Sequence, residues 1–134
     1  MLAKELAAKR YRPRTLAIGT NTDPYQPIEK DYGLMRRTLE VLRDFRHPVG
    51  IVTKGTLIER DIDILSEMAA DNLVRVGISV TTMDRELSRR MEPRVPSPER
   101  RLRAIERLAK AGVQVRVMAS PMIPGLTDPD LERI

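Results

Sequence analysis

Short apolar runs alternate with longer amphipathic stretches along the 134 residues of this chain. The apolar runs are rich in β-branched residues and mostly apolar on both faces, which is typical of buried parallel strands. Between them, apolar residues recur at helical spacing. The pattern predicts strands at 15–20, 49–53, 74–80 and 113–119. It predicts helices at 31–46, 56–69, 84–91 and 98–111, and the start of another at Asp128 or Pro129.

Local signals mark where several of these helices begin and end. Thr56 followed by Glu59 has the spacing of a capping box, in which each side chain bonds the backbone of the other residue. Ser97 is a candidate N-cap with Pro98 at the first helical position. Gly112 is expected to end that helix, because glycine readily adopts the left-handed conformation found after helices.

The regular alternation of strand and helix predicts a parallel α/β sheet with right-handed crossovers. No Gly-x-Gly-x-x-Gly or Gly-x-x-x-x-Gly-Lys sequence follows any strand, which argues against a dinucleotide or P-loop site. Every predicted strand instead ends in polar residues at the same edge. We therefore expect a partial (β/α) TIM-type barrel of about four βα units, in one domain over residues 1–134.

Composition narrows the function classes. The chain is 41% hydrophobic and 32% charged and contains no cysteine, so it offers no disulfide, thiolate nucleophile or cysteine-held metal. No apolar run approaches the roughly 18 residues of a membrane span. The first residues have no apolar core of a secretory signal, and the expected location is the cytoplasm.

The net charge of +5 comes largely from arginine, and two basic clusters stand out. They contain Lys9, Arg10, Arg12 and Arg14, and Arg100, Arg101, Arg103 and Arg107. One interpretation is a nucleic-acid partner. The other is solvated helix faces, which the interspersed acidic residues and the four aromatic residues of the chain favour.

Polar residues follow each predicted strand, and in a barrel they would converge on one face. Together they offer hydroxyls, an amide, an ammonium and one or two carboxylates, which suits a polar, zwitterionic small molecule. No pair of acid and base groups of the glycosidase or protease kind is present. The residues are Thr20, Asn21, Thr22, Asp23, Lys54, Ser79, Thr81, Thr82, Ser120 and the loop 122–128.

Most of these candidates also have a purely structural interpretation. Lys54 is either a pocket cation or a solvated loop residue, and Ser79 either faces a ligand or bonds a neighbouring carbonyl. Asp23 either binds a ligand or caps the turn at Pro24 through an Asx-type bond. His47 is expected to be structural, and Glu92 is expected to pair with the helix that follows it.

Four segments resemble radical S-adenosylmethionine (SAM) proteins related to spore photoproduct lyase. They are TNTDPYQPIE at 20–29, VTKG at 52–55, SVTTMDRELSRRMEPRVPSPERRLRAIERLAKAG at 79–112 and PMIPGLTD at 121–128. The resemblance implies a partial barrel that binds SAM and a [4Fe-4S] cluster and generates a 5′-deoxyadenosyl radical. The family holds its cluster with a Cys-x-x-x-Cys-x-x-Cys loop, which this chain lacks. We therefore expect a fragment that supplies strands two to five, with the cluster cysteines outside it.

The resemblance also implies roles for individual residues. Thr20, Asn21 and Thr22 match the segment that receives the SAM amino group, and Asp23 adjoins them. Lys54 matches a lysine that neutralises the SAM carboxylate, and Ser79 matches a serine that hydrogen-bonds SAM. Ile123 and Gly125 match the segment whose backbone contacts adenine. Nothing matches the radical-relaying cysteine and tyrosines of the lyase, and Tyr25 is given no radical role.

Three alternatives stay open at this point. The chain is a non-catalytic relic of such an enzyme, a nucleic-acid-binding α/β module, or part of an unrelated (β/α) barrel whose polar edge binds a phosphate or a sugar.

Overall fold

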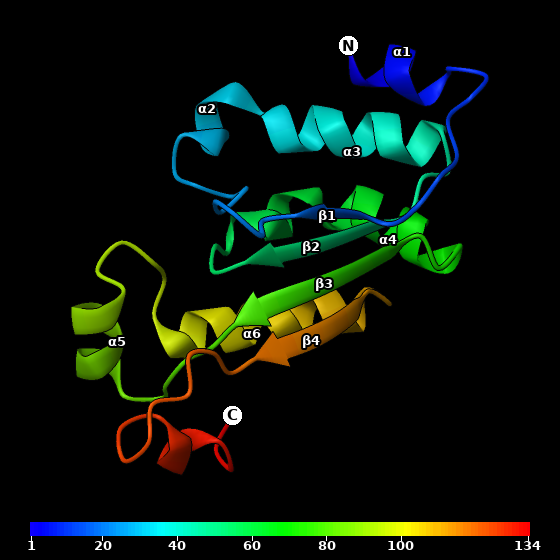
Figure 1. The fold of residues 1–134 in the computed structure, drawn as a ribbon. Coiled ribbons are helices and arrows are strands. Elements are labelled where there is room, and N and C mark those ends of the chain that lie inside the picture. Colours follow the sequence, from blue (N-terminus) through cyan, green and yellow to red (C-terminus); the bar gives the residue numbers. More distant parts are fainter.

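The computed structural model describes all residues 1–134. Four parallel strands form one sheet in the order β1-β2-β3-β4 (Figure 1). The strands are β1 (Leu16–Ile18), β2 (Val49–Thr53), β3 (Val74–Ser79) and β4 (Gln114–Met118). The helices are α1 (Leu2–Leu6), α2 (Glu29–Tyr32), α3 (Leu34–Asp44), α4 (Ile62–Ala70), α5 (Arg85–Met91) and α6 (Pro98–Lys110), with 3-10 turns η1 (Leu57–Asp61) and η2 (Asp128–Asp130). The predicted α/β class, with four parallel strands in one sheet, is confirmed.

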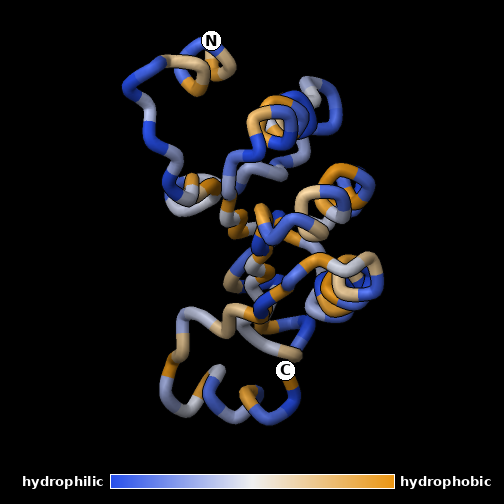
Figure 2. The backbone as a smooth tube through the Cα atoms, turned by 90° about the vertical axis from the view of Figure 1, so that its right-hand side faces the viewer, coloured by the Kyte–Doolittle hydropathy of each residue, from blue (hydrophilic) through white to orange (hydrophobic).

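Helices α3, α4 and α6 cover one face of the sheet, and Figure 2 shows them almost end-on along that face. Alternate strand residues such as Ile51, Val76 and Ile78 point toward these helices and are buried. They belong to a core of 17 buried residues that also includes Leu39 and Leu108. Burial of such apolar surface is the main force that holds the helices on the sheet.

The opposite face of the sheet carries no helix (Figure 2). Val52, Gly77 and Met118 lie on this face, since a Cβ on Gly77 would lie 2.8 Å from the sulfur of Met118 and 3.6 Å from a methyl of Val52. In a (β/α) barrel the helix-free face lines the interior. The arrangement is consistent with a partial barrel.

The predicted helix at 31–46 is wrong as a single element. Gly33 has φ +57° and ends α2, and α3 begins directly after it. The Glu29 carboxylate accepts hydrogen bonds from the backbone N–H of Leu34 and Met35 and so caps α3. A side chain five residues away supplies this cap, which a search for N-cap residues at the helix start does not find.

Other boundaries differ as well. Thr56 makes no side-chain cap, and Glu59 pairs with Arg100 and Arg107, so the predicted capping box is wrong and a 3-10 turn precedes α4. The chain after Asp128 forms only the turn η2, not a longer helix. Short α1 was not predicted, and three of the strands are one to three residues shorter than expected.

Two predicted caps are confirmed. The Ser97 hydroxyl accepts from the backbone N–H of Arg100, with Pro98 at the start of α6, and Gly112 follows α6 at φ +83°.

None of the helices has both the length and the apolar character that a membrane span requires.

Candidate functional site

A cavity of about 210 Å³ opens at the carboxyl end of the sheet. It is formed where the loops after β1 and β2 meet the last residue of β3. The lining residues are Gly19, Asn21, Thr22, Asp23, Val52, Thr53, Lys54 and Ser79. Complete small-molecule sites commonly have volumes of roughly 300–1,000 Å³, so this cavity suits one end of a ligand.

The structure brings five of the eight predicted site residues together here: Asn21, Thr22, Asp23, Lys54 and Ser79. Thr20 is exposed and does not line the cavity. Ile123 and Gly125 lie in the loop after β4, where the backbone N–H of Ile123 donates to the Thr127 hydroxyl. That loop does not reach the cavity.

Asp23 fixes the two loops that form the cavity. One carboxylate oxygen accepts from the backbone N–H of Tyr25 at 2.9 Å, an Asx turn, and from the Thr53 hydroxyl at 2.6 Å. The other accepts from the backbone N–H of Lys54 at 2.7 Å. The carboxylate therefore joins the end of β1 to the end of β2.

The remaining polar side chains around the cavity are available to a ligand. Asn21 and Thr22 are exposed, and their side chains make no hydrogen bond within the chain. Ser79 is buried, but its hydroxyl bonds no neighbouring carbonyl, while its own backbone oxygen accepts from Arg101 at 2.7 Å. The cavity thus presents an amide and two hydroxyls without partners in the chain.

The one ammonium at the cavity is held by a carboxylate. Nζ of Lys54 lies 2.5 Å from Oε1 of Glu92, and Oε2 of Glu92 accepts from the Arg101 guanidinium at 2.8 Å. Burial alone would raise the pKa of Glu92, but the hydrogen bond from Lys54 and the charge of Arg101 outweigh it and lower that pKa. The predicted pairing of Glu92 with the following helix is confirmed by Arg101 of α6.

The loop after β1 is also held by a buried polar network that sequence reasoning did not find. Asp61 accepts hydrogen bonds from the Tyr25 hydroxyl at 3.0 Å and from Arg60 and Arg36, and Arg60 also pairs with Glu29. Burial and the neighbouring Asp61 charge raise the pKa of Tyr25. The rigid PYQPIE loop is therefore fixed by its Tyr and Glu side chains, which point into the protein.

His47 lies at the opposite edge of the sheet, as predicted. It is buried, with its Nε2 2.6 Å from the Tyr11 hydroxyl and its Nδ1 3.0 Å from the backbone oxygen of Pro48. These bonds anchor the segment before β1, in agreement with a structural role.

The two arginine clusters differ in the structure. In the second cluster Arg101 is almost completely buried, and Arg100 and Arg107 pair with Glu59, while Arg103 is exposed. The first cluster, Lys9, Arg10, Arg12 and Arg14, is exposed throughout and makes no ion pair within the chain.

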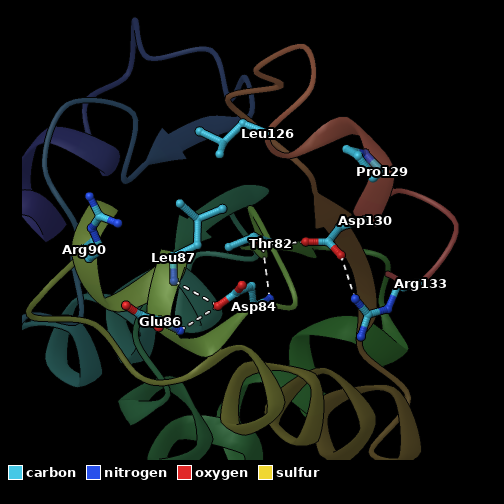
Figure 3. A pocket seen from close by; sticks show the side chains of 9 residues that line it. All are labelled: Thr82, Asp84, Glu86, Leu87, Arg90, Leu126, Pro129, Asp130 and Arg133. Carbon is cyan, nitrogen blue, oxygen red and sulfur yellow. Dashed lines mark hydrogen bonds and ion pairs between the residues drawn. The ribbon is translucent and has the colours of Figure 1, made fainter.

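A second cavity of about 420 Å³ lies between α5 and the C-terminal segment (Figure 3). Asp130 lines this cavity, and its carboxylate accepts hydrogen bonds from the Thr82 hydroxyl at 2.5 Å and from the backbone N–H of Met83. Figure 3 shows Asp84 turned to the start of α5, where it accepts from the N–H groups of Glu86 and Leu87. The carboxylates here serve local structure.

The side chains of this chain do not form a set of ligands for a metal cluster. The chain has no cysteine, and no group of three or more His, Cys, Asp or Glu is placed to hold a metal ion. The donor set at the first cavity, by contrast, matches an amino-acid group, because it combines a cation for a carboxylate with oxygens for an amine.

A parallel βα sheet with a polar cavity at its carboxyl edge defines a ligand-binding domain of the (β/α) type. The family model for the radical SAM superfamily matches residues 1–134. The chain therefore belongs to the radical SAM superfamily, and membership implies SAM and a [4Fe-4S] cluster.

Three relatives are similar over most of the chain. An uncharacterized protein of Mycobacterium tuberculosis (strain H37Rv) is 41% identical over 128 residues, 96% of this chain and 38% of the relative. An uncharacterized protein of Methanocaldococcus jannaschii is 35% identical over 124 residues, which are 92% of this chain and 46% of the relative. An uncharacterized protein of Acidianus two-tailed virus is 28% identical over 121 residues, which are 90% of this chain and 39% of the relative. The chain spans less than half the length of each. No solved structure matches it significantly.

Proposed function

We propose that residues 1–134 are the SAM-binding portion of a spore photoproduct lyase-like radical SAM enzyme. In this proposal the chain supplies strands two to five of the family barrel and acts in the cytoplasm. The cluster is held by cysteines outside these residues, and the enzyme generates a 5′-deoxyadenosyl radical from SAM. The observation that carries the proposal is the meeting of Lys54, Ser79, Asn21 and Thr22 at one cavity.

Each side chain of the cavity has a role toward the methionyl end of SAM. The Lys54 ammonium pairs with the carboxylate, and the Ser79 hydroxyl donates a hydrogen bond to it. Oxygens of Asn21 and Thr22 accept from the amino group, while Asp23 keeps the two loops together. Hydrogen bonds that involve charged groups are stronger than neutral ones, and the Lys54 contact is the one in which both partners carry a full charge, so Lys54 is the largest contributor among them.

The other predicted contacts complete the proposed site. Thr20 continues the segment that faces the amino group. The loop after β4 carries Ile123 and Gly125, and Gly125 has φ +72°, a conformation that suits glycine. We assign the backbone of this loop to the adenine end of SAM.

Lys54→Met tests the proposal. We expect the dissociation constant of S-adenosylhomocysteine, measured by titration calorimetry on the intact protein, to rise by about tenfold or more, because a hydrogen bond to a charged group contributes about 1.5–3 kcal/mol. Lys110→Met is the matched control, since Lys110 pairs only with Glu106 on the exposed side of α6. Equal affinities of the two variants would refute a role of Lys54 in binding.

A second function, binding of nucleic acid, is favoured by the exposed and unpaired side chains of Lys9, Arg10, Arg12 and Arg14. These residues lie in the segment between α1 and β1, and we call this segment the basic arm. Each phosphate contact contributes about 0.9 to the slope of log affinity for duplex DNA against log salt concentration. If the four basic residues of the arm contact phosphates, replacing all four with glutamine will therefore reduce the magnitude of that slope by about 3–4. An unchanged slope in a filter-binding or anisotropy titration would exclude the arm from the interface.

A further inference from the structure

The Lys54 ammonium at the cavity forms an ion pair with one carboxylate, that of Glu92. Its Nζ lies 2.5 Å from Oε1 of Glu92, although its side chain remains 37% exposed. Glu92 itself does not line the cavity. It sits at the end of α5, in a part of the chain that follows β3 rather than β2. The position of the ammonium is thus fixed by a residue remote in sequence that does not reach the ligand space.

Glu92 is in turn fixed by Arg101. The Glu92 side chain is 9% exposed and that of Arg101 is 1% exposed. The Arg101 guanidinium donates to Oε2 of Glu92 at 2.8 Å, to the backbone oxygens of Ser79 and Pro96, and to the Ser88 hydroxyl. Because so many acceptors hold it, the guanidinium stays in place whatever happens at Lys54.

The order of charges explains what Glu92 does for the lysine. Two cations, Lys54 and Arg101, bond opposite oxygens of one carboxylate. The negative charge of Glu92 is balanced by the buried Arg101, which leaves the Lys54 charge for an anionic ligand group. Without the carboxylate, the two cations would repel each other in a poorly hydrated region. The half-exposed lysine would then move to solvent, because only it is free to do so.

We propose that Glu92 is a positioning residue for the SAM carboxylate: it holds the Lys54 ammonium at the cavity wall before the ligand arrives. This inference rests on the proposed function of Lys54. Fixing a lysine side chain in advance reduces the conformational entropy lost on binding. Glu92 acts through Lys54 alone and makes no contact with the ligand.

The test compares two probes that differ at the amino-acid group. S-adenosylhomocysteine carries the carboxylate, whereas 5′-methylthioadenosine keeps the adenosine part and lacks it. In the intact protein, Glu92→Gln is expected to weaken the binding of S-adenosylhomocysteine by at least about fivefold, because binding must then fix a lysine side chain that was free. The affinity for 5′-methylthioadenosine is expected to stay unchanged. Glu59→Gln, whose similarly buried carboxylate also pairs with arginines of α6, should change neither.

A double-mutant cycle separates positioning from general damage to the fold. In a Lys54→Met background, Glu92→Gln should have no further effect on S-adenosylhomocysteine. Equal weakening of both probes, an effect that persists without Lys54, or tighter binding in Glu92→Gln would each overturn the proposal. If Glu92→Gln does not fold, Glu92→Asp keeps the charge beside Arg101 but shortens the reach to Lys54, and it should weaken only the probe with the carboxylate.

The result also distinguishes this inference from the proposed function. If Lys54→Met itself leaves S-adenosylhomocysteine unaffected, the assignment of the cavity fails. If Lys54→Met weakens it and Glu92→Gln does not, only the role of Glu92 fails.

Discussion

Asp61→Ala is expected to destabilise the protein by about 3–5 kcal/mol, the range found when one partner of a buried charge pair is removed. The Asp61 side chain is completely buried. Its two oxygens accept from Arg60 twice, from Arg36 and from the Tyr25 hydroxyl. Truncation leaves these donors without their acceptor and opens a space beneath the loop that follows β1. Urea unfolding of the intact protein, followed by circular dichroism, measures the change.

Asp63→Ala is the matched control for this prediction. Asp63 pairs with the same Arg36, at 2.7 Å, but its side chain is 58% exposed. An exposed ion pair contributes about 0–1 kcal/mol, so the control should change the free energy of unfolding by no more than that. If both variants lose the same free energy, the network around Asp61 does not hold the loop in the way the structure indicates.

The sheet itself could be predicted from the sequence because its signals are local. Short, mostly apolar runs such as 49–53 and 74–79 identify buried parallel strands without knowledge of any partner. Ser97 and Gly112 likewise set the limits of α6 through contacts within a few residues. The expectation that polar residues gather at one sheet edge followed from parallel topology, and Lys54 and Ser79 do line one cavity.

What could not be predicted depends on contacts between distant residues. Glu59 satisfied the spacing of a capping box, but Arg100 and Arg107 of α6 compete for its carboxylate. Glu29 lies before the helix predicted at 31–46, and its carboxylate caps α3 across a left-handed glycine. The partner that a charged side chain bonds is determined by which groups lie near it in the fold, and sequence spacing alone does not reveal that partner.

The same argument applies to the candidate site. Asp23 stands out in the sequence as a potential ligand group, yet in the structure its carboxylate joins two loops. Tyr25 of the same segment turns inward and bonds Asp61. The glutamate that holds Lys54 comes from 38 positions further along the chain. Sequence reasoning thus brought Asp23, Lys54 and Ser79 to one sheet edge, while the residues that hold them in place became visible only through the fold.

The second prediction with a large expected effect concerns Gly19, where the end of β1 lies close to β2. Gly19 has φ +92°, and a Cβ at this position would lie 1.9 Å from the backbone oxygen of Val52. No flexible side chain can move to relieve that contact, because the obstacle is the main chain of β2. Gly19→Ala must therefore separate the loop after β1 from β2, which are the two walls of the cavity.

We expect Gly19→Ala to weaken the binding of S-adenosylhomocysteine by more than about tenfold, because separating the two cavity walls removes at least one hydrogen bond to a charged ligand group, which contributes about 1.5–3 kcal/mol. Stability should fall as well, by more than the roughly 1–2 kcal/mol that a left-handed backbone alone costs a residue with a side chain. Gly112→Ala isolates that backbone cost, because Gly112 has φ +83° but no atom within 4 Å of an added Cβ. The close contacts with Val52 and Pro24 are the part of the effect that Gly112 lacks, so unfolding and calorimetric titration of both variants measure it directly. Equal losses in the two variants would show that the cavity does not depend on this approach, and retention of full affinity in Gly19→Ala would place the SAM methionyl group elsewhere.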